Sequence, residues 1–145
     1  MPRFVLCLLL LTGLLLAAPL APTRAADNPQ PKAKAAKKPL GTWTREAGGW
    51  KIKFVIKEDE MTIKLEDGDG NTIEIEAAYA VTKDGVLFGC STKATAKGIE
   101  AKVEKGDLFS VAYSANDKEL TVSDLKGTHA SDESRKLIEG VYKKQ

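Results

Sequence analysis

The stretch Glu66-Asp67-Gly68-Asp69-Gly70-Asn71-Thr72 carries oxygen-bearing side chains at alternate positions, with glycines between them. Oxygens at this spacing are typical of an EF-hand calcium loop. Read from Asp67, the pattern fits that template at Asp67, Asp69 and Asn71. The sixth position, which needs a glycine, is Thr72, and the twelfth, which needs a bidentate carboxylate, is Ala78. We therefore predict a turn between two strands and no metal site.

The rest of the sequence contains few residues in patterns typical of a catalytic site. The single histidine, His129, lies next to Gly127-Thr128 and close to Ser131 and Asp132. A catalytic triad needs a base that a third group orients, and sequence neighbours do not provide that geometry. One histidine and, outside the apolar N-terminal run that contains Cys7, one cysteine are also too few for a structural zinc site, which needs about four ligands. With no Walker-type loop, G-x-S-x-G elbow or H-E-x-x-H motif, we expect no catalytic residues and no cofactor, and a solvated loop histidine at His129.

The first 26 residues have the pattern of a secretory signal peptide. Arg3 precedes an apolar run over 4–16, and small residues follow over 18–26. The apolar run is shorter than the roughly 20 residues that a membrane-spanning helix needs. We expect cleavage after Ala25 or Ala26 and export to the periplasm or beyond, without a transmembrane span afterwards. An uncleaved anchor is the alternative.

Residues 27–39 are predicted to form a disordered linker. Within them, PQPKAKAAKKP contains four lysines, three prolines and no large apolar side chain, so the segment cannot bury enough surface to offset its chain entropy. The lysines could contact an acidic envelope component, although a solvated spacer is the simpler interpretation. Loss of Arg3 and Arg24 with the signal leaves 20 Lys and Arg against 20 Asp and Glu. Because exported proteins rarely meet nucleic acid, it is not an expected partner.

Residues 40–145 form one predicted all-β domain. Apolar and polar residues alternate with period 2, which predicts antiparallel strands with one solvated face. The segments with this pattern or with short apolar runs are 50–57, 61–66, 73–81, 86–88, 109–113, 120–122 and 141–143. The segment 93–105 has two possible interpretations: a strand pair broken at Gly98, or a long polar loop.

The hairpin around 67–71 and one helix can be placed more closely. Pairing Leu65 with Ile73 and Ile63 with Ile75 leaves 67–71 as the loop, and it sets Lys64 opposite Glu74 in a favourable cross-strand pair. A helix over 131–140 is predicted from Ser131 as its cap and Gly140 as its stop.

Aromatic residues in the predicted strands are the candidate ligand contacts. In a small barrel, inward aromatic side chains either fill the core or line a cavity. Filling is the default expectation, because a domain of this size has little apolar material to spare. The candidates are Trp50, Phe54, Tyr79, Phe88, Phe109 and Tyr113.

Cys90 is the one cysteine downstream of the predicted signal. Its setting in Leu87-Phe88-Gly89-Cys90 favours a buried thiol that acts as a small apolar residue. A reactive or intermolecular thiol is the alternative.

Leu40-Gly41-Thr42-Trp43 at the start of the strand region resembles the G-x-W start of lipocalin-like (calycin) barrels. Together with YAVTKDGVLFG at 79–89, LTVSDLKG at 120–127 and IEGVYKK at 138–144, it makes residues 39–145 similar to small exported lipocalin-like domains of planctomycete-type bacteria. The resemblance implies an antiparallel meander that forms a small barrel or a strongly curved sheet, with one short C-terminal helix. It also implies that Trp43 packs across a closed base beneath a basic residue, for which Arg135 is the candidate. It implies no particular activity.

These observations favour an exported, non-enzymatic β-barrel module that binds a small hydrophobic ligand. The alternative is a module that interacts with the cell envelope or with a protein through its sheet surface and its basic linker. The sequence leaves the oligomeric state open.

Overall fold

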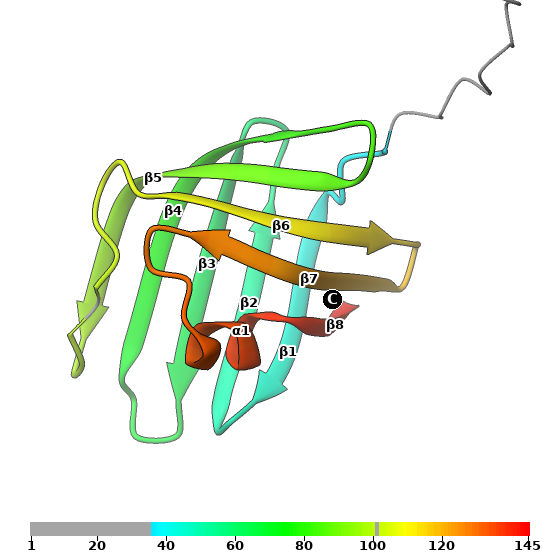
Figure 1. Ribbon diagram of the computed structural model, residues 1–145. Helices are drawn as coiled ribbons and strands as arrows, with labels where there is room; N and C mark the ends of the chain where they lie inside the picture. The colour runs from blue at the N-terminus through cyan, green and yellow to red at the C-terminus, as the bar shows by residue number, and fades with distance from the viewer. Residues whose placement is uncertain (1–35, 101) are drawn as a thin grey trace, which may run out of the picture. The chain divides into compact units, whose positions relative to one another are not determined.

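The computed structural model describes residues 36–100 and 102–145, which form eight strands and one helix (Figure 1). The elements, in order, are β1 (Gly41–Ala47), β2 (Trp50–Ile56), β3 (Glu60–Asp67), β4 (Thr72–Val81), β5 (Val86–Lys97), β6 (Leu108–Ala115), β7 (Glu119–Gly127), α1 (Asp132–Ile138) and β8 (Gly140–Lys144). The predicted signal peptide and most of the predicted linker lie outside the described residues.

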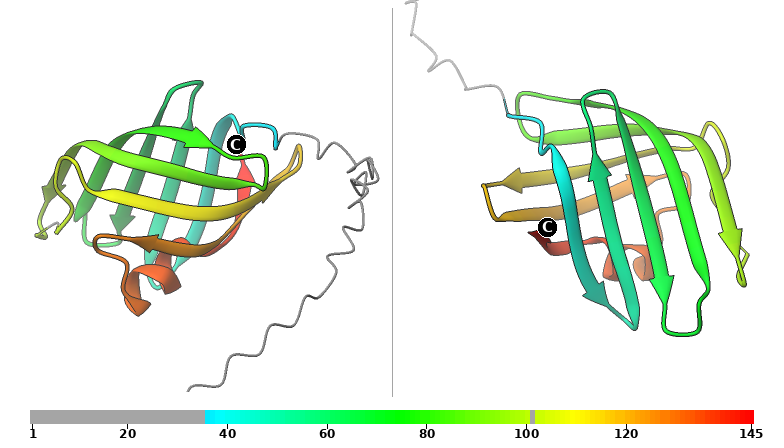
Figure 2. Two further views of the ribbon diagram at one scale, coloured as in Figure 1. Left: turned by 45° about the horizontal axis from the view of Figure 1, so that its top comes forward. Right: turned by 180° about the vertical axis from the view of Figure 1, so that it is seen from behind.

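The strands form a closed antiparallel barrel in which each strand pairs with the next and β8 returns to β1. Figure 2 shows the strands wrapping around one interior, with α1 at one end. The closing pair is short, because only Trp43 and Thr44 of β1 pair with Lys144 and Lys143 of β8. The predicted all-β meander with one C-terminal helix is confirmed, and the barrel closes.

The two ends of the barrel differ in what covers them. At one end lie residues 36–40 and the turns that follow β2, β4 and β6; we call this the closed end. At the other end lie the turns after β1 and β3, residues 98–100 and 102–107, residues 128–131 and α1; we call this the mouth.

The β3–β4 hairpin has the predicted register. Leu65 pairs with Ile73, Ile63 with Ile75 and Lys64 with Glu74. In the loop, Oδ1 of Asp67 accepts hydrogen bonds from the backbone N–H groups of Asp69 and Asn71 at 3.0 and 2.9 Å, and Oδ2 accepts one from the Asn71 side chain at 2.7 Å. The Asn71 side chain and these N–H groups hold the pKa of Asp67 below its usual value. Asp67 therefore organises a turn, as the sequence predicts.

The segment 93–105 follows neither of the two sequence interpretations completely. β5 continues along β4 as far as Lys97, past an irregularity between Glu76 and Ala77, whereas β6 pairs with β5 only as far as Cys90. Beyond Gly98 the chain forms a loop that returns to β6. The strand before Gly98 agrees with the first interpretation and the loop after it with the second; the sequence left both open because Lys93, Ala94, Thr95 and Ala96 give no strong apolar alternation.

The helix α1 begins after the predicted cap. Ser131 accepts a hydrogen bond from the backbone N–H of Ser134, and the Ser134 hydroxyl accepts one from the N–H of Ser131. Two side chains attach the helix to the barrel: the Tyr142 hydroxyl donates to the carbonyl of Ile138 at 2.6 Å, and the Arg45 guanidinium donates to the carbonyl of Leu137 at 2.8 Å.

Candidate functional site

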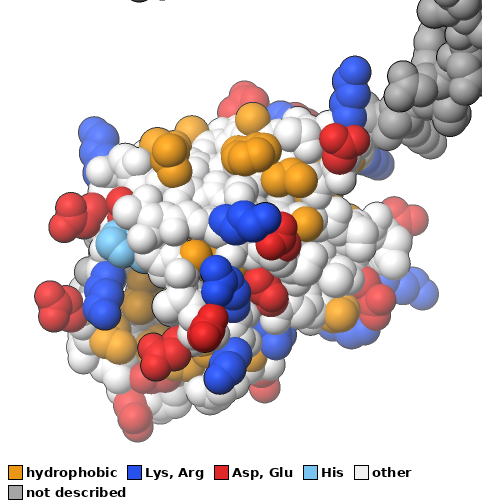
Figure 3. Space-filling model, in the orientation of Figure 1, with side chains coloured by type: hydrophobic (Ala, Val, Ile, Leu, Met, Phe, Trp, Pro, Cys, Tyr) orange, Lys and Arg blue, Asp and Glu red, His pale blue; other side chains and the backbone are white. Residues whose placement is uncertain are grey.

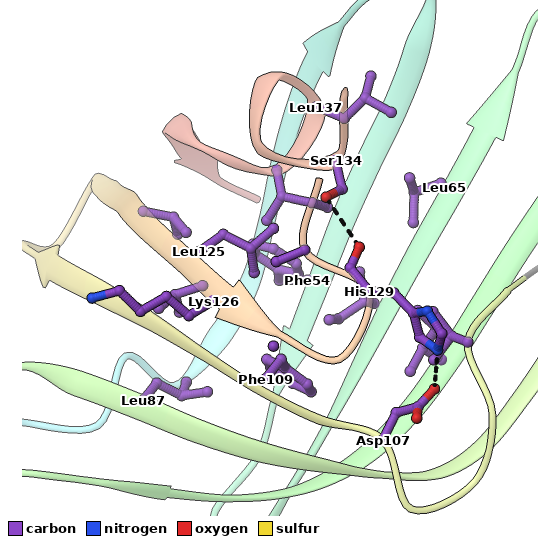
Figure 4. Close-up of a pocket in the computed structure, with 18 of the residues that line it drawn as sticks. Phe54, Leu65, Leu87, Asp107, Phe109, Leu125, Lys126, His129, Ser134 and Leu137 are labelled. Carbon is purple, nitrogen blue, oxygen red and sulfur yellow. Dashed lines mark hydrogen bonds and ion pairs between the residues drawn. The ribbon is translucent and has the colours of Figure 1, made fainter. Parts of the chain in front are cut away.

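The barrel contains an apolar cavity of about 390 Å³ that is partly open to solvent at its rim, and this volume lies within the range of small-molecule sites. An eight-stranded barrel can either fill its interior with side chains or hold one small ligand. The expectation of a filled interior is therefore wrong. Strand residues form most of the wall: Phe54, Ile56, Met61, Ile63, Leu65, Ile73, Ile75, Leu87, Phe109, Val111, Leu120, Val122 and Leu125. Figure 4 shows Phe54, Leu87, Phe109 and Leu125 around a common space.

A glycine in the wall determines where one aromatic ring lies. Gly89 of β5 pairs with Phe109 of β6, and a Cβ added at Gly89 would overlap the Phe109 ring. The ring therefore lies against the β5 backbone. A side chain at position 89 would displace the Phe109 ring. The absence of a side chain at Gly89 therefore allows the ring to pack in this position.

The closed end is covered by one buried hydrogen bond and by more exposed polar contacts. Trp43 is 1% exposed, and its Nε1 donates to the carbonyl of Pro39 at 2.8 Å. The Tyr113 hydroxyl donates to the carbonyl of Lys37 at 3.2 Å. The Lys38 ammonium pairs with Glu58 and Asp59 beside the β2–β3 turn. Residues 37–39 are thus part of the domain, which corrects the prediction that the disordered linker reaches Pro39.

The basic residue above Trp43 is Lys144 and not Arg135. The Lys144 ammonium lies 5.3 Å from the centre of a Trp43 ring, a distance suited to a cation–π contact. Arg135 donates instead to the carbonyl of Leu125 at 3.1 Å and to the carboxylate of Asp132 at 2.9 Å. The assignment of Arg135 as the stacking partner is wrong, because α1 lies at the mouth whereas Lys144 pairs directly with Trp43 across the β1–β8 junction.

A second aromatic group lies beside the cavity. The rings of Phe54 and Tyr142 stack with their centres 4.6 Å apart, and the Arg45 guanidinium lies 5.9 Å from the Tyr142 ring. Tyr142 is fully buried, and burial raises the pKa of its hydroxyl to about 12 although Arg45 acts in the opposite direction. Tyr142 thus remains neutral and donates to α1.

Charged residues line the cavity at its mouth. They come from three places: the loop 98–107, the end of β7 with the following loop, and α1. They are Glu100, Lys102, Asp107, Lys126, His129 and Glu133. Figure 3 shows hydrophobic side chains in a hollow beside the single histidine, which marks this rim.

One side-chain contact joins two loops across the rim. Nε2 of His129 lies 3.0 Å from Oδ2 of Asp107, and Figure 4 shows the two side chains meeting beside the apolar wall. The backbone supports this junction, since the N–H of Thr128 donates to the carbonyl of Leu108 at 3.0 Å. His129 is in a loop as predicted, but it holds that loop to the neighbouring one. We call this pair of residues the rim pair.

The structure brings three of the six candidate aromatic residues to the cavity: Phe54, Phe109 and Tyr113. The other three lie elsewhere. Trp50 is half-buried at the start of β2, opposite Asp67. The Tyr79 hydroxyl donates to the carbonyl of Lys57 at 2.5 Å, at the closed end. Phe88 is on the outer face and 52% exposed.

The aliphatic part of the wall was not assigned a role by sequence reasoning. The signal was present, because Ile63, Ile75 and Val111 occupy the apolar positions of alternating strands. Alternation places a side chain on the inner face but does not give the diameter of the barrel, and the diameter decides whether the inner side chains meet.

The outer face of β5 and β6 carries a small uncharged patch. Phe88 and Leu108 are 52% and 62% exposed, and Cys90 is paired with Leu108. Leu87 and Ser91 point inward, so alternation directs Cys90 outward, where it is half-buried. The expectation of a buried thiol is wrong, because the run Leu87-Phe88-Gly89-Cys90 gives no alternation from which to choose the inner face.

Over residues 36–100 and 102–145, no three His, Cys, Asp or Glu side chains are grouped so that they could hold a metal ion. The same part of the chain contains no helix of the length and hydrophobicity required to cross a membrane.

Comparisons of the chain with protein-family models, with curated proteins and with solved structures found no match. The fold itself, an eight-stranded antiparallel barrel with a C-terminal helix, is consistent with a lipocalin-like barrel.

Proposed function

We propose that this protein is an exported, non-enzymatic binding module of the lipocalin-like type, which holds a small hydrophobic ligand inside its barrel. The observation that carries the proposal is the apolar cavity of about 390 Å³. Transfer of an apolar ligand from water into such a space is favourable in proportion to the apolar area removed from water. Export rests on the signal-peptide pattern of the first 26 residues.

Two features support the lipocalin-like assignment. Trp43, the tryptophan of the G-x-W start, is buried at the closed end beneath a basic residue. The chain then continues as a single meander that ends in a short helix and a closing strand.

A non-enzymatic role is supported by the chemistry of the cavity. The part of its wall that the strands form is almost wholly apolar, and its charged groups are at the rim. Cys90 faces outward from β5, whereas His129 is engaged with Asp107 at the rim. These two residues therefore do not combine into a nucleophile and base.

A titration of the full chain with an environment-sensitive hydrophobic dye tests the proposal. We expect saturable binding of one dye molecule, which Ile75→Trp abolishes because the indole occupies the cavity. Ala78→Trp is the matched control, because it adds an indole on the outer face of the same strand, and it should bind as the unaltered chain does. Circular dichroism of both variants checks that the barrel is intact. Equal binding by both variants, or no binding by the unaltered chain, would contradict the proposal.

A second candidate function is interaction with the cell envelope or with a protein. The outer patch of Phe88 and Leu108 favours it, together with the lysines of the predicted linker. Deletion of residues 27–35, which leaves the ordered contacts of 37–39 in place, would then release the protein from envelope fractions at low salt. Unchanged fractionation of the deletion variant and of a Phe88→Ser, Leu108→Ser double variant would count against this candidate.

A further inference from the structure

We infer that the cavity takes an uncharged ligand whose apolar body has about a dozen non-hydrogen atoms. The inference rests on the proposed binding function and specifies the class of ligand for that site. It follows from the size of the cavity, from the chemistry of its wall and from the charges at its mouth.

The volume limits the size of the ligand. A water molecule occupies about 30 Å³ of the liquid, and a methylene group is of similar size. A cavity of about 390 Å³ therefore holds about 13 groups of that size. A medium-length alkyl chain or a compound of two fused rings fits, whereas a longer molecule would extend through the mouth into water.

The wall provides no partner for a charge. Apart from Lys126 at the rim, the strand residues that line the cavity offer one side-chain oxygen, the hydroxyl of Tyr113, and it donates to the carbonyl of Lys37. The Arg45 guanidinium donates to the carbonyls of Leu137 and Glu139. A carboxylate or ammonium group inside the barrel would thus lose its hydration without gaining a counter-ion, which is strongly unfavourable.

The mouth carries charges of both signs. Lys102, Lys126 and His129 line it together with Glu100, Asp107 and Glu133. Two of the three basic groups already have acidic partners, since His129 pairs with Asp107 and the Lys126 ammonium lies 2.6 Å from a carboxylate oxygen of Asp124. A charged head group at the rim would compete with these partners, and a neutral one would not.

The test compares three probes with the same chain: 1-dodecanol, dodecanoate and dodecyltrimethylammonium, each below its micelle concentration, titrated into the full chain by dye displacement. We expect 1-dodecanol to bind more than threefold more tightly than either charged probe. In a series of 1-alkanols, Kd should fall about fourfold per added methylene and level off near a dozen non-hydrogen atoms. Ile75→Trp should abolish all of this binding, and Ala78→Trp should not.

The outcomes separate the inference from the proposed function. Dodecanoate or dodecyltrimethylammonium binding as tightly as 1-dodecanol or more tightly, and lost in Ile75→Trp, would overturn the inference and leave the binding function standing. A fall in Kd that continues unchanged to hexadecanol would overturn the size limit. Binding of none of the probes or of the dye would remove the proposed function itself.

Discussion

The two ends of the barrel are closed in different ways. At the closed end, the Trp43 indole is buried and donates to the Pro39 carbonyl, and a cation covers the ring. At the mouth, the loops 98–107 and 128–131 are joined by the rim pair, whose side chains are partly exposed. Buried, satisfied hydrogen bonds are costly to break, whereas exposed ion pairs contribute about 0–1 kcal/mol. The difference indicates that the closed end stabilises the fold, and it makes the mouth the expected entrance for the ligand that we propose.

The two sides of the mouth differ in how firmly they are attached to the barrel. One side of it is α1, which the buried Tyr142 and the Arg45 guanidinium fasten to the barrel. The other side consists of the two loops. We therefore expect α1 to behave like the closed end under perturbation and the loops to open more readily.

The largest effect should come from the closed end. Trp43→Ala removes a fully buried indole and leaves a cavity, which should lower the free energy of unfolding by about 3–5 kcal/mol. Urea denaturation followed by circular dichroism measures this change.

Phe88→Ala is the control for that measurement, because it truncates an aromatic side chain on the outer face. We expect a change of about 0.5 kcal/mol or less there. A loss at Trp43 no larger than that at Phe88 would contradict the view that the closed end stabilises the barrel.

Alkaline pH should have the next largest effect, through Tyr142. Its pKa is about 12 in the folded chain against an ordinary value of 10.0, so the folded state retains the proton that the unfolded state loses. The stabilisation is fully present below pH 10 and is lost as the pH rises to 12, by about 2–3 kcal/mol. Urea denaturation at a series of pH values measures it.

Tyr142→Phe tests the origin of that pH dependence. The variant cannot ionise at this position, so its stability should fall less steeply between pH 10 and 12. Burial also raises the pKa of Tyr79 and Tyr113, so some slope should remain. An unchanged slope would contradict the raised pKa of Tyr142.

Much of the fold could be predicted because it is encoded locally. The β3–β4 register followed from alternation within two adjacent strands and a glycine-containing turn, and α1 from Ser131 and Gly140. The resemblance that starts at Leu40 left a closed barrel and a strongly curved sheet open, and only the pairing of β8 with β1 decides between them. Contacts between residues distant in sequence were not predictable in the same way: Lys144 reaches Trp43 only because β8 returns to β1.

Part of the candidate site could be predicted because alternation within a single strand shows which side chains share a face. Phe54, Phe109 and Tyr113 were correctly placed on inner faces, since each belongs to a clearly alternating strand. Phe88 was not, because the neighbouring Leu87 is also apolar and only pairing with β4 and β6 decides which of the two points inward. The cavity depends on the diameter of the barrel, which is a property of all eight strands together.

The smallest effect on stability, but the most specific one on binding, should come from the rim pair. Asp107→Asn and His129→Gln should each change the free energy of unfolding by less than about 1 kcal/mol. Each should raise the association and dissociation rates of a hydrophobic dye severalfold and leave Kd within about twofold, because the loops open more often while the cavity wall is unchanged. Stopped-flow fluorescence measures both rates.

Lys38→Gln provides the matched comparison, since it breaks a partly exposed ion pair with Glu58 and Asp59 at the closed end. If the dye enters through the mouth, this variant should leave both rates unchanged. Rates that rise equally in Lys38→Gln and Asp107→Asn would mean that the two ends open alike, and the division of roles between them would be wrong. Rates that rise only in Lys38→Gln would place the entrance beside residues 37–39, with Pro39, which also lines the cavity, as the group that must move.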